Sequence, residues 1–121
     1  MAENVNLSAP ELNITVMQGD TYTLTFTWKN SAGTAINLTG YTAKYQARAT
    51  PDSSSTIISL TESSGLTLGG AAGTIVLLVS ATAMGLLDMG TYSHNLEVTS
   101  GGGVATTLFR GTLTILRETV R

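Results

Sequence analysis

Strict alternation of apolar and polar residues along two segments predicts β-strands that each bury one face. Residues 21–28 alternate between large apolar side chains and a row of threonines: Thr21, Thr23, Thr25 and Thr27. Residues 41–48 alternate in the same way, and their polar side carries Lys44 and Arg48. β-Branched and aromatic residues suit a half-buried sheet, so the threonine row is predicted to face water or a partner.

Further segments predict shorter or less regular strands, namely residues 56–60, 66–68, 75–79, 91–99 and 104–116. The continuous apolar run 75–79 is typical of a strand buried on both faces. Glycine- and serine-rich stretches separate the segments, as turns require. Within the last strand, Gly111 is predicted to mark a β-bulge.

Residues 80–89 have the only helix-like spacing, with Ser80 as the predicted N-cap and Gly90 as the C-terminal stop. Seven to eight short antiparallel strands with this one helical turn predict an all-β sandwich rather than an α/β fold. The first nine or so residues are polar and unpatterned, and Pro10 disfavours helix before it. We therefore expect an extended N-terminal arm over residues 1–12 and a single β-sandwich domain over residues 13–121.

Composition points to a surface suited to an assembly. Hydrophobic residues make up 42% of the 121 residues and charged residues 12%, against about 25% charged in ordinary soluble domains. The surface is therefore expected to be mainly threonine, serine, glycine and asparagine, which gives little charge-based protection against association. A net charge of −2 argues against nucleic acid as a partner.

Other features narrow the possible classes. The chain has no cysteine, so disulfides and thiolate chemistry are not expected. Its first six residues lack the basic and apolar regions of a secretory signal. The longest apolar stretch, residues 75–87, is too short and too interrupted to cross a bilayer.

The residues that could carry catalysis are sparse. His94 is the only histidine, and its parity places it on the core side of its strand, near the strand end, as a packing residue. The eight carboxylates are scattered singly, without the spacing of a calcium loop or a glycosidase pair. Neither glycine-rich turn, 69–73 or 101–103, precedes a phosphate-binding helix. We expect no enzyme activity, metal, cofactor or small-molecule substrate.

Aromatic residues leave a carbohydrate-binding adhesion module open as an alternative. The candidates for a sugar platform are Tyr22, Trp28, Tyr41, Tyr45 and Tyr92. Their shared inward parity favours a place in the core instead.

An ordered series of short motifs resembles small virion proteins of tailed bacteriophages. The motifs are Gln18-Gly-Asp20, Tyr22-Thr-Leu-Thr-Phe-Thr-Trp28, Ile36-Asn-Leu-Thr-Gly-Tyr41, Ala47-Arg48, Gly73-Thr-Ile75, Gly90-Thr-Tyr92, Leu96-Glu-Val98, Arg110-Gly-Thr-Leu-Thr114 and Thr119-Val-Arg121. From about Leu12 onward, the chain is similar to the N-terminal domain of phage baseplate upper proteins. It departs at His94-Asn95, where that family more often has an aromatic residue followed by Asp.

The resemblance implies an immunoglobulin-like β-sandwich and a non-catalytic role in a virion, in the tail, baseplate or neck. Decoration of the capsid is an alternative position. Its partners would be other virion proteins and further copies of itself, with no membrane partner. The predicted partner-binding residues lie in the arm and on the threonine row: Glu3, Asn4, Val5, Asn6, Leu7, Thr21, Thr23, Thr25 and Thr27.

Overall fold

The computed structural model describes residues 11–50 and 52–117, and within them the chain forms eight strands and two very short helices. The all-β prediction is therefore confirmed. The elements are β1 (Ile14–Met17), β2 (Tyr22–Thr27), β3 (Thr42–Arg48), β4 (Ile58–Thr61), β5 (Leu66–Leu68), a 3₁₀ turn η1 (Gly70–Ala72), β6 (Thr74–Val79), α1 (Ala81–Gly85), β7 (Gly90–Thr99) and β8 (Ala105–Leu116).

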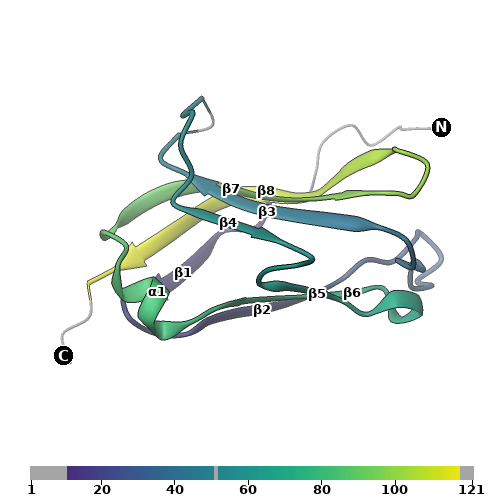
Figure 1. Ribbon diagram of the computed structural model, residues 1–121, viewed down its shortest axis with the longest axis horizontal. Helices are drawn as coiled ribbons and strands as arrows, with labels where there is room; N and C mark the ends of the chain where they lie inside the picture. The colour runs from purple at the N-terminus through teal and green to yellow at the C-terminus, as the bar shows by residue number, and fades with distance from the viewer. Residues whose placement is uncertain (1–10, 51, 118–121) are drawn as a thin grey trace.

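The strands form two layers that pack face to face (Figure 1). In the described part of the chain, the large sheet has the strand order β1-β8-β7-β3-β4, and the small sheet has the order β2-β6-β5. Strand β5 contacts β3, and Phe26 of β2 packs against Phe109 of β8. The small sheet therefore lies with its β2 edge over the β8 side of the large sheet.

One strand pair departs from the predicted antiparallel arrangement. β1 runs parallel to β8, with Ile14 opposite Leu113 and Met17 opposite Leu116. The other paired strands are antiparallel. The parallel pair joins the two ends of the described chain, which local alternation in sequence does not reveal.

Strand β6 corrects the prediction of a strand buried on both faces. Ile75, Leu77 and Val79 are buried, whereas Val76 is half-buried and Leu78 is 52% exposed. Its apolar run thus covers two different environments, the core and the outer surface of the small sheet. Since both sides are apolar, sequence periodicity alone does not separate them.

The helix after β6 is shorter than the predicted segment 80–89. It covers Ala81–Gly85, and Ser80 is its N-cap, with the side-chain oxygen accepting a hydrogen bond from the Ala83 N–H at 3.2 Å. Met84 is the residue that the helix buries. Among the described residues, no helix is long and apolar enough to cross a membrane.

The bulge in β8 lies elsewhere than predicted. The pairing of β7 with β8 shifts between Leu96 and Glu97, which stand opposite Phe109 and Thr107, so Leu108 is the extra residue. Gly111 pairs regularly with His94 instead. A side chain at Gly111 would collide with the carbonyl of Leu12, so this glycine allows the chain before β1 to approach β8 closely.

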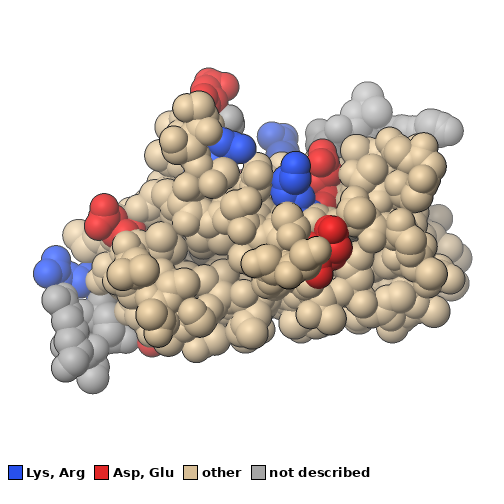
Figure 2. Space-filling view, in the orientation of Figure 1, with Lys and Arg blue, Asp and Glu red and all other residues tan. Residues whose placement is uncertain are grey.

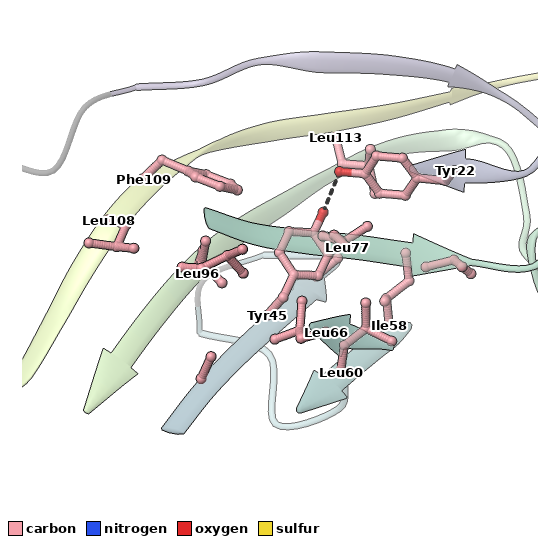
Figure 3. Packing of buried hydrophobic residues seen from close by; sticks show 14 of the residues in the cluster. Tyr22, Tyr45, Ile58, Leu60, Leu66, Leu77, Leu96, Leu108, Phe109 and Leu113 are labelled. Carbon is pink, nitrogen blue, oxygen red and sulfur yellow. Dashed lines mark hydrogen bonds between the residues drawn. The ribbon is translucent and has the colours of Figure 1, made fainter. Parts of the chain in front are cut away.

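The core lies between the sheets and combines aromatic and aliphatic side chains (Figure 3). Its largest fully buried members are Tyr45, Phe109, Leu38, Ile75, Met84, Leu96, Leu113, Ile115 and Val98. Tyr45 stands at its centre, edge-to-face with Tyr22 of the opposite sheet at a ring separation of 6.2 Å.

Candidate functional site

The predicted threonine row lies on the outer face of the small sheet. Thr21, which precedes β2, and Thr23, Thr25 and Thr27 within it are all exposed. Cross-strand pairing puts Thr23 opposite Leu78 and Thr25 opposite Val76. The row is therefore continuous with two aliphatic side chains of β6, and these were absent from the predicted binding set because β6 was expected to be buried on both faces.

The outer face of the small sheet carries no charge within its described strands. We call the surface formed by Thr23, Thr25, Thr27, Thr67, Thr74, Val76 and Leu78 the uncharged face. Every residue of β2, β5 and β6 lacks a formal charge. Figure 2 shows both sheets edge-on, and along its lower side, where these strands lie, the surface in view is almost entirely free of red and blue.

The outer face of the large sheet is different. Lys44 stands opposite Glu97 across β3 and β7. Arg48 donates hydrogen bonds to Gln46 and to the Ser53 carbonyl, each at 2.9 Å. The carboxylate of Glu62 accepts a hydrogen bond from the Ala43 N–H, which lowers the pKa of that carboxyl group. The charged residues within the described strands, Lys44, Arg48, Glu97 and Arg110, therefore all belong to the large sheet, whereas the other described charges lie outside the strands, with Asp20 and Lys29 close to the two ends of β2.

A chain of hydrogen bonds crosses the core and ends at the first described residues. The Tyr22 and Tyr45 hydroxyls are 3.0 Å apart, and the Tyr45 hydroxyl is 2.7 Å from Nδ1 of His94. Nε2 of His94 lies 2.7 Å from the Leu12 carbonyl. Figure 3 shows the first of these bonds between the sheets. This series of hydrogen bonds links the small sheet, β3, β7 and the segment before β1.

The direction of this hydrogen-bond chain follows from its last member. A carbonyl oxygen only accepts, so Nε2 of His94 carries the proton and donates to Leu12. In the neutral ring Nδ1 is then the acceptor, so the Tyr45 hydroxyl donates to it. Tyr45 has its single proton in that bond, so Tyr22 donates to Tyr45. Every polar group at the centre of the core thereby has a partner, as burial requires.

Burial favours the neutral form of each member. Burial raises the pKa of both tyrosine hydroxyls, and it lowers the pKa of His94 against the opposing effect of the Leu12 carbonyl. His94 is 3% exposed, so its predicted core position is confirmed, but it lies mid-strand rather than near a strand end. This series of hydrogen bonds between uncharged groups therefore connects the two sheets with each other and with Leu12.

The aromatic residues are divided between the core and its margin. Tyr22 and Tyr45 are buried, whereas Trp28, Tyr41 and Tyr92 are half-buried. Trp28 and Tyr41 pack edge-to-face with a ring separation of 6.1 Å. These aromatic rings pack against the core cluster instead of standing free of it.

The remaining predicted contact residues, Glu3, Asn4, Val5, Asn6 and Leu7, lie outside the described residues, so their role stays a prediction. Within the described part, no three histidine, cysteine or carboxylate side chains gather in a way that could hold a metal ion. The hydrogen-bond chain was not predicted, although Tyr22, Tyr45 and His94 share inward parity. The polar groups at the ends of these three core-facing side chains are the signal in the sequence, because buried polar groups need hydrogen-bond partners.

Comparison with protein-family models finds no family that matches the chain, and comparison with curated proteins finds no match.

Proposed function

We propose that this protein is a non-catalytic structural component of a tailed-phage virion, in the tail, baseplate or neck, where it acts through contacts with other virion proteins. The uncharged face carries the part of the proposal that concerns contact with other proteins, and the motif resemblance described above carries the virion assignment. The surfaces of free monomers commonly carry interspersed charges, because these charges oppose association. A face of threonines with Leu78 and Val76 is better suited to contact with another protein.

We further infer that the two sheets have an immunoglobulin-like arrangement. Two features support this. The order β8-β7-β3-β4 beside β2-β6-β5 matches the variable-type arrangement, in which strands G, F, C and C′ form one sheet and B, E and D the other. In addition, the Tyr92 hydroxyl near the start of β7 donates to the Asp88 carbonyl at 2.8 Å, as in the tyrosine corner of such domains.

Two alternatives predict different partners. A capsid decoration protein would use the same uncharged face against a capsid surface, and it differs only in position on the particle. A carbohydrate-binding module would use the Trp28 and Tyr41 rings, which pack against each other at the margin of the core. Binding on a glycan array would favour the second alternative, and loss of that binding in Trp28→Ala would assign it to this pair.

The test is incorporation into particles purified from the source host, measured by quantitative mass spectrometry. Thr25→Lys places a charge in the middle of the uncharged face, and Thr42→Lys is the matched control on an exposed position of β3. We expect Thr25→Lys to reduce incorporation while Thr42→Lys does not, with both variants folded by circular dichroism. Absence of the unaltered chain from such particles would overturn the proposal.

A further inference from the structure

One edge of the large sheet is only half covered by described residues. β1 pairs with residues 113–116 of β8, and Glu11 forms a parallel bridge with Arg110. Residues 105–107 and Phe109 of β8 pair with β7 on one side, and the bulge residue Leu108 lies between them. On their other side the described part of the chain places no strand. An open edge of this kind presents N–H and C=O groups to an incoming strand.

The small sheet beneath this edge shows the same incompleteness. Along the inward side of β2, Tyr22 is 3% exposed, whereas Leu24 and Phe26 are only half-buried. Phe26 packs against Phe109 at a ring separation of 5.5 Å, so this half-buried ring lies beside the uncovered stretch of β8. A strand added beside residues 105–109 would therefore cover apolar surface as well as backbone groups.

The N-terminal arm contains a segment with the pattern of such a strand. The arm was treated above as polar and unpatterned, but within it Val5, Leu7 and Ala9 alternate with Asn4, Asn6 and Ser8. One side of an extended segment over residues 4–9 would thus be apolar and the other polar. The apolar side fits the half-buried surface of Leu24 and Phe26, and the polar side fits solvent.

Resting on the proposed structural role, we infer that residues 4–9 of a second copy of this chain pair with the open edge formed by residues 105–109 of β8. Reciprocal exchange of arms would give a two-fold contact in which each copy completes the large sheet of the other. The main-chain hydrogen bonds would supply affinity, and Val5 and Leu7 would select the register by covering Phe26.

The arm of the same chain is less suited to this edge, because the segment that follows the arm already pairs with β8 in a fixed register. Leu12 N donates to Arg110 O, and Gln18 N donates to Leu116 O, so in both bonds the acceptor lies 98 residues further along the chain. This spacing does not continue past Arg110, because Leu108 is the extra residue of the bulge and the pairing of β8 shifts there. Residue 10 is proline, which has no N–H. An arm from another copy is not tied to this register.

Cross-linking between separate single-cysteine variants tests the inference, because the chain itself has no cysteine. Asn6→Cys places a thiol on the polar side of the arm. Thr107→Cys places one on β8, on the outer side that it shares with Glu97 across the pair. The control partner is Ser59→Cys on β4, at the opposite edge of the large sheet. Equal amounts of two purified variants are mixed, treated with a short bis-maleimide and separated by mass.

We expect Asn6→Cys with Thr107→Cys to give a mixed covalent dimer, and Asn6→Cys with Ser59→Cys to give none. Deleting residues 2–9 from the Thr107→Cys chain removes its own arm and should increase the yield of mixed dimer. A link that forms only within the double variant Asn6→Cys/Thr107→Cys would assign the edge to the own arm and overturn the inference. Absence of any link would also overturn it, whereas the proposed virion role is judged separately by particle mass spectrometry.

Discussion

The Tyr45 hydroxyl lies 2.7 Å from Nδ1 of His94, at the centre of a core in which both residues are almost completely buried. Because His94 donates its other ring proton to the Leu12 carbonyl, Tyr45 must be the donor in this bond. The pair thus orders the interior in two ways. It positions the tyrosine between the sheets, and it ties β7 to the segment that leads into β1.

Tyr45→Phe is expected to destabilise the protein by about 1–3 kcal/mol, because it leaves the Tyr22 hydroxyl and Nδ1 of His94 without their partner in the core. The free energy of unfolding from urea denaturation measures this. Tyr41→Phe is the control: Tyr41 is half-buried, and its change is expected within about 0.5 kcal/mol. Equal losses in the two variants would contradict the assigned role of Tyr45.

His94 predicts a loss of stability in mild acid. Burial holds the pKa of His94 below its ordinary value of 6.5, so as the pH falls below that value the unfolded chain takes up a proton before the folded protein does. The free energy of unfolding should therefore be constant above pH 6.5 with respect to this group and decrease as the pH falls toward its lowered pKa. His94→Gln should flatten the curve between neutral pH and the onset of carboxylate titration. An unchanged slope in His94→Gln would show that other groups dominate.

Alternation predicted the strands that bury one face and expose the other, as β2 and β3 show. It gave the wrong burial for β6, because Leu78 is apolar although its side chain faces outward. In the sequence, such a strand cannot be distinguished from one that is buried on both faces. The parallel pairing of Ile14 with Leu113 depends on contacts between distant parts of the chain, which no local pattern encodes.

The candidate site was predictable to a similar degree. Exposure of Thr23, Thr25 and Thr27 followed directly from period-two alternation. The His94 hydrogen-bond chain did not, because parity gives the side of a strand but not the neighbour across the core. Gly111 was likewise predicted to mark a bulge. Its actual role is to make room for the Leu12 carbonyl, and this could not be predicted locally because Leu12 is far away in the sequence.

Gly111→Ala is expected to destabilise the protein by about 1–3 kcal/mol, because the new methyl group would collide with the Leu12 carbonyl and approach Asn13 Oδ1 to 2.7 Å. Gly101→Ala is the matched control in the β7–β8 turn, where the nearest atom to the added carbon is the Gly40 carbonyl oxygen at 3.6 Å. Thermal unfolding compares the two. A stable Gly111→Ala variant would mean that residues 11–13 shift away from β8 at little cost in free energy.

Truncation of two neighbouring leucines of β6 should destabilise the protein to very different extents, because their side chains face different sides of the small sheet. Leu77 is 2% exposed and Leu78 is 52% exposed. Leu77→Ala is expected to lower the free energy of unfolding by about 2–5 kcal/mol, and Leu78→Ala to change it by no more than about 0.5 kcal/mol. Urea denaturation of the two variants tests the orientation of the strand.

A substitution of Leu78 can distinguish an effect on folding from an effect on assembly. Since its side chain belongs to the uncharged face, Leu78→Lys should leave the unfolding curve nearly unchanged and still reduce incorporation into particles. The matched surface change is Ser59→Lys on β4 of the large sheet, where the side chain is exposed and the cross-strand neighbour is Gln46. If Leu78→Lys and Ser59→Lys were incorporated equally, the uncharged face would not be the surface through which the protein meets its partners.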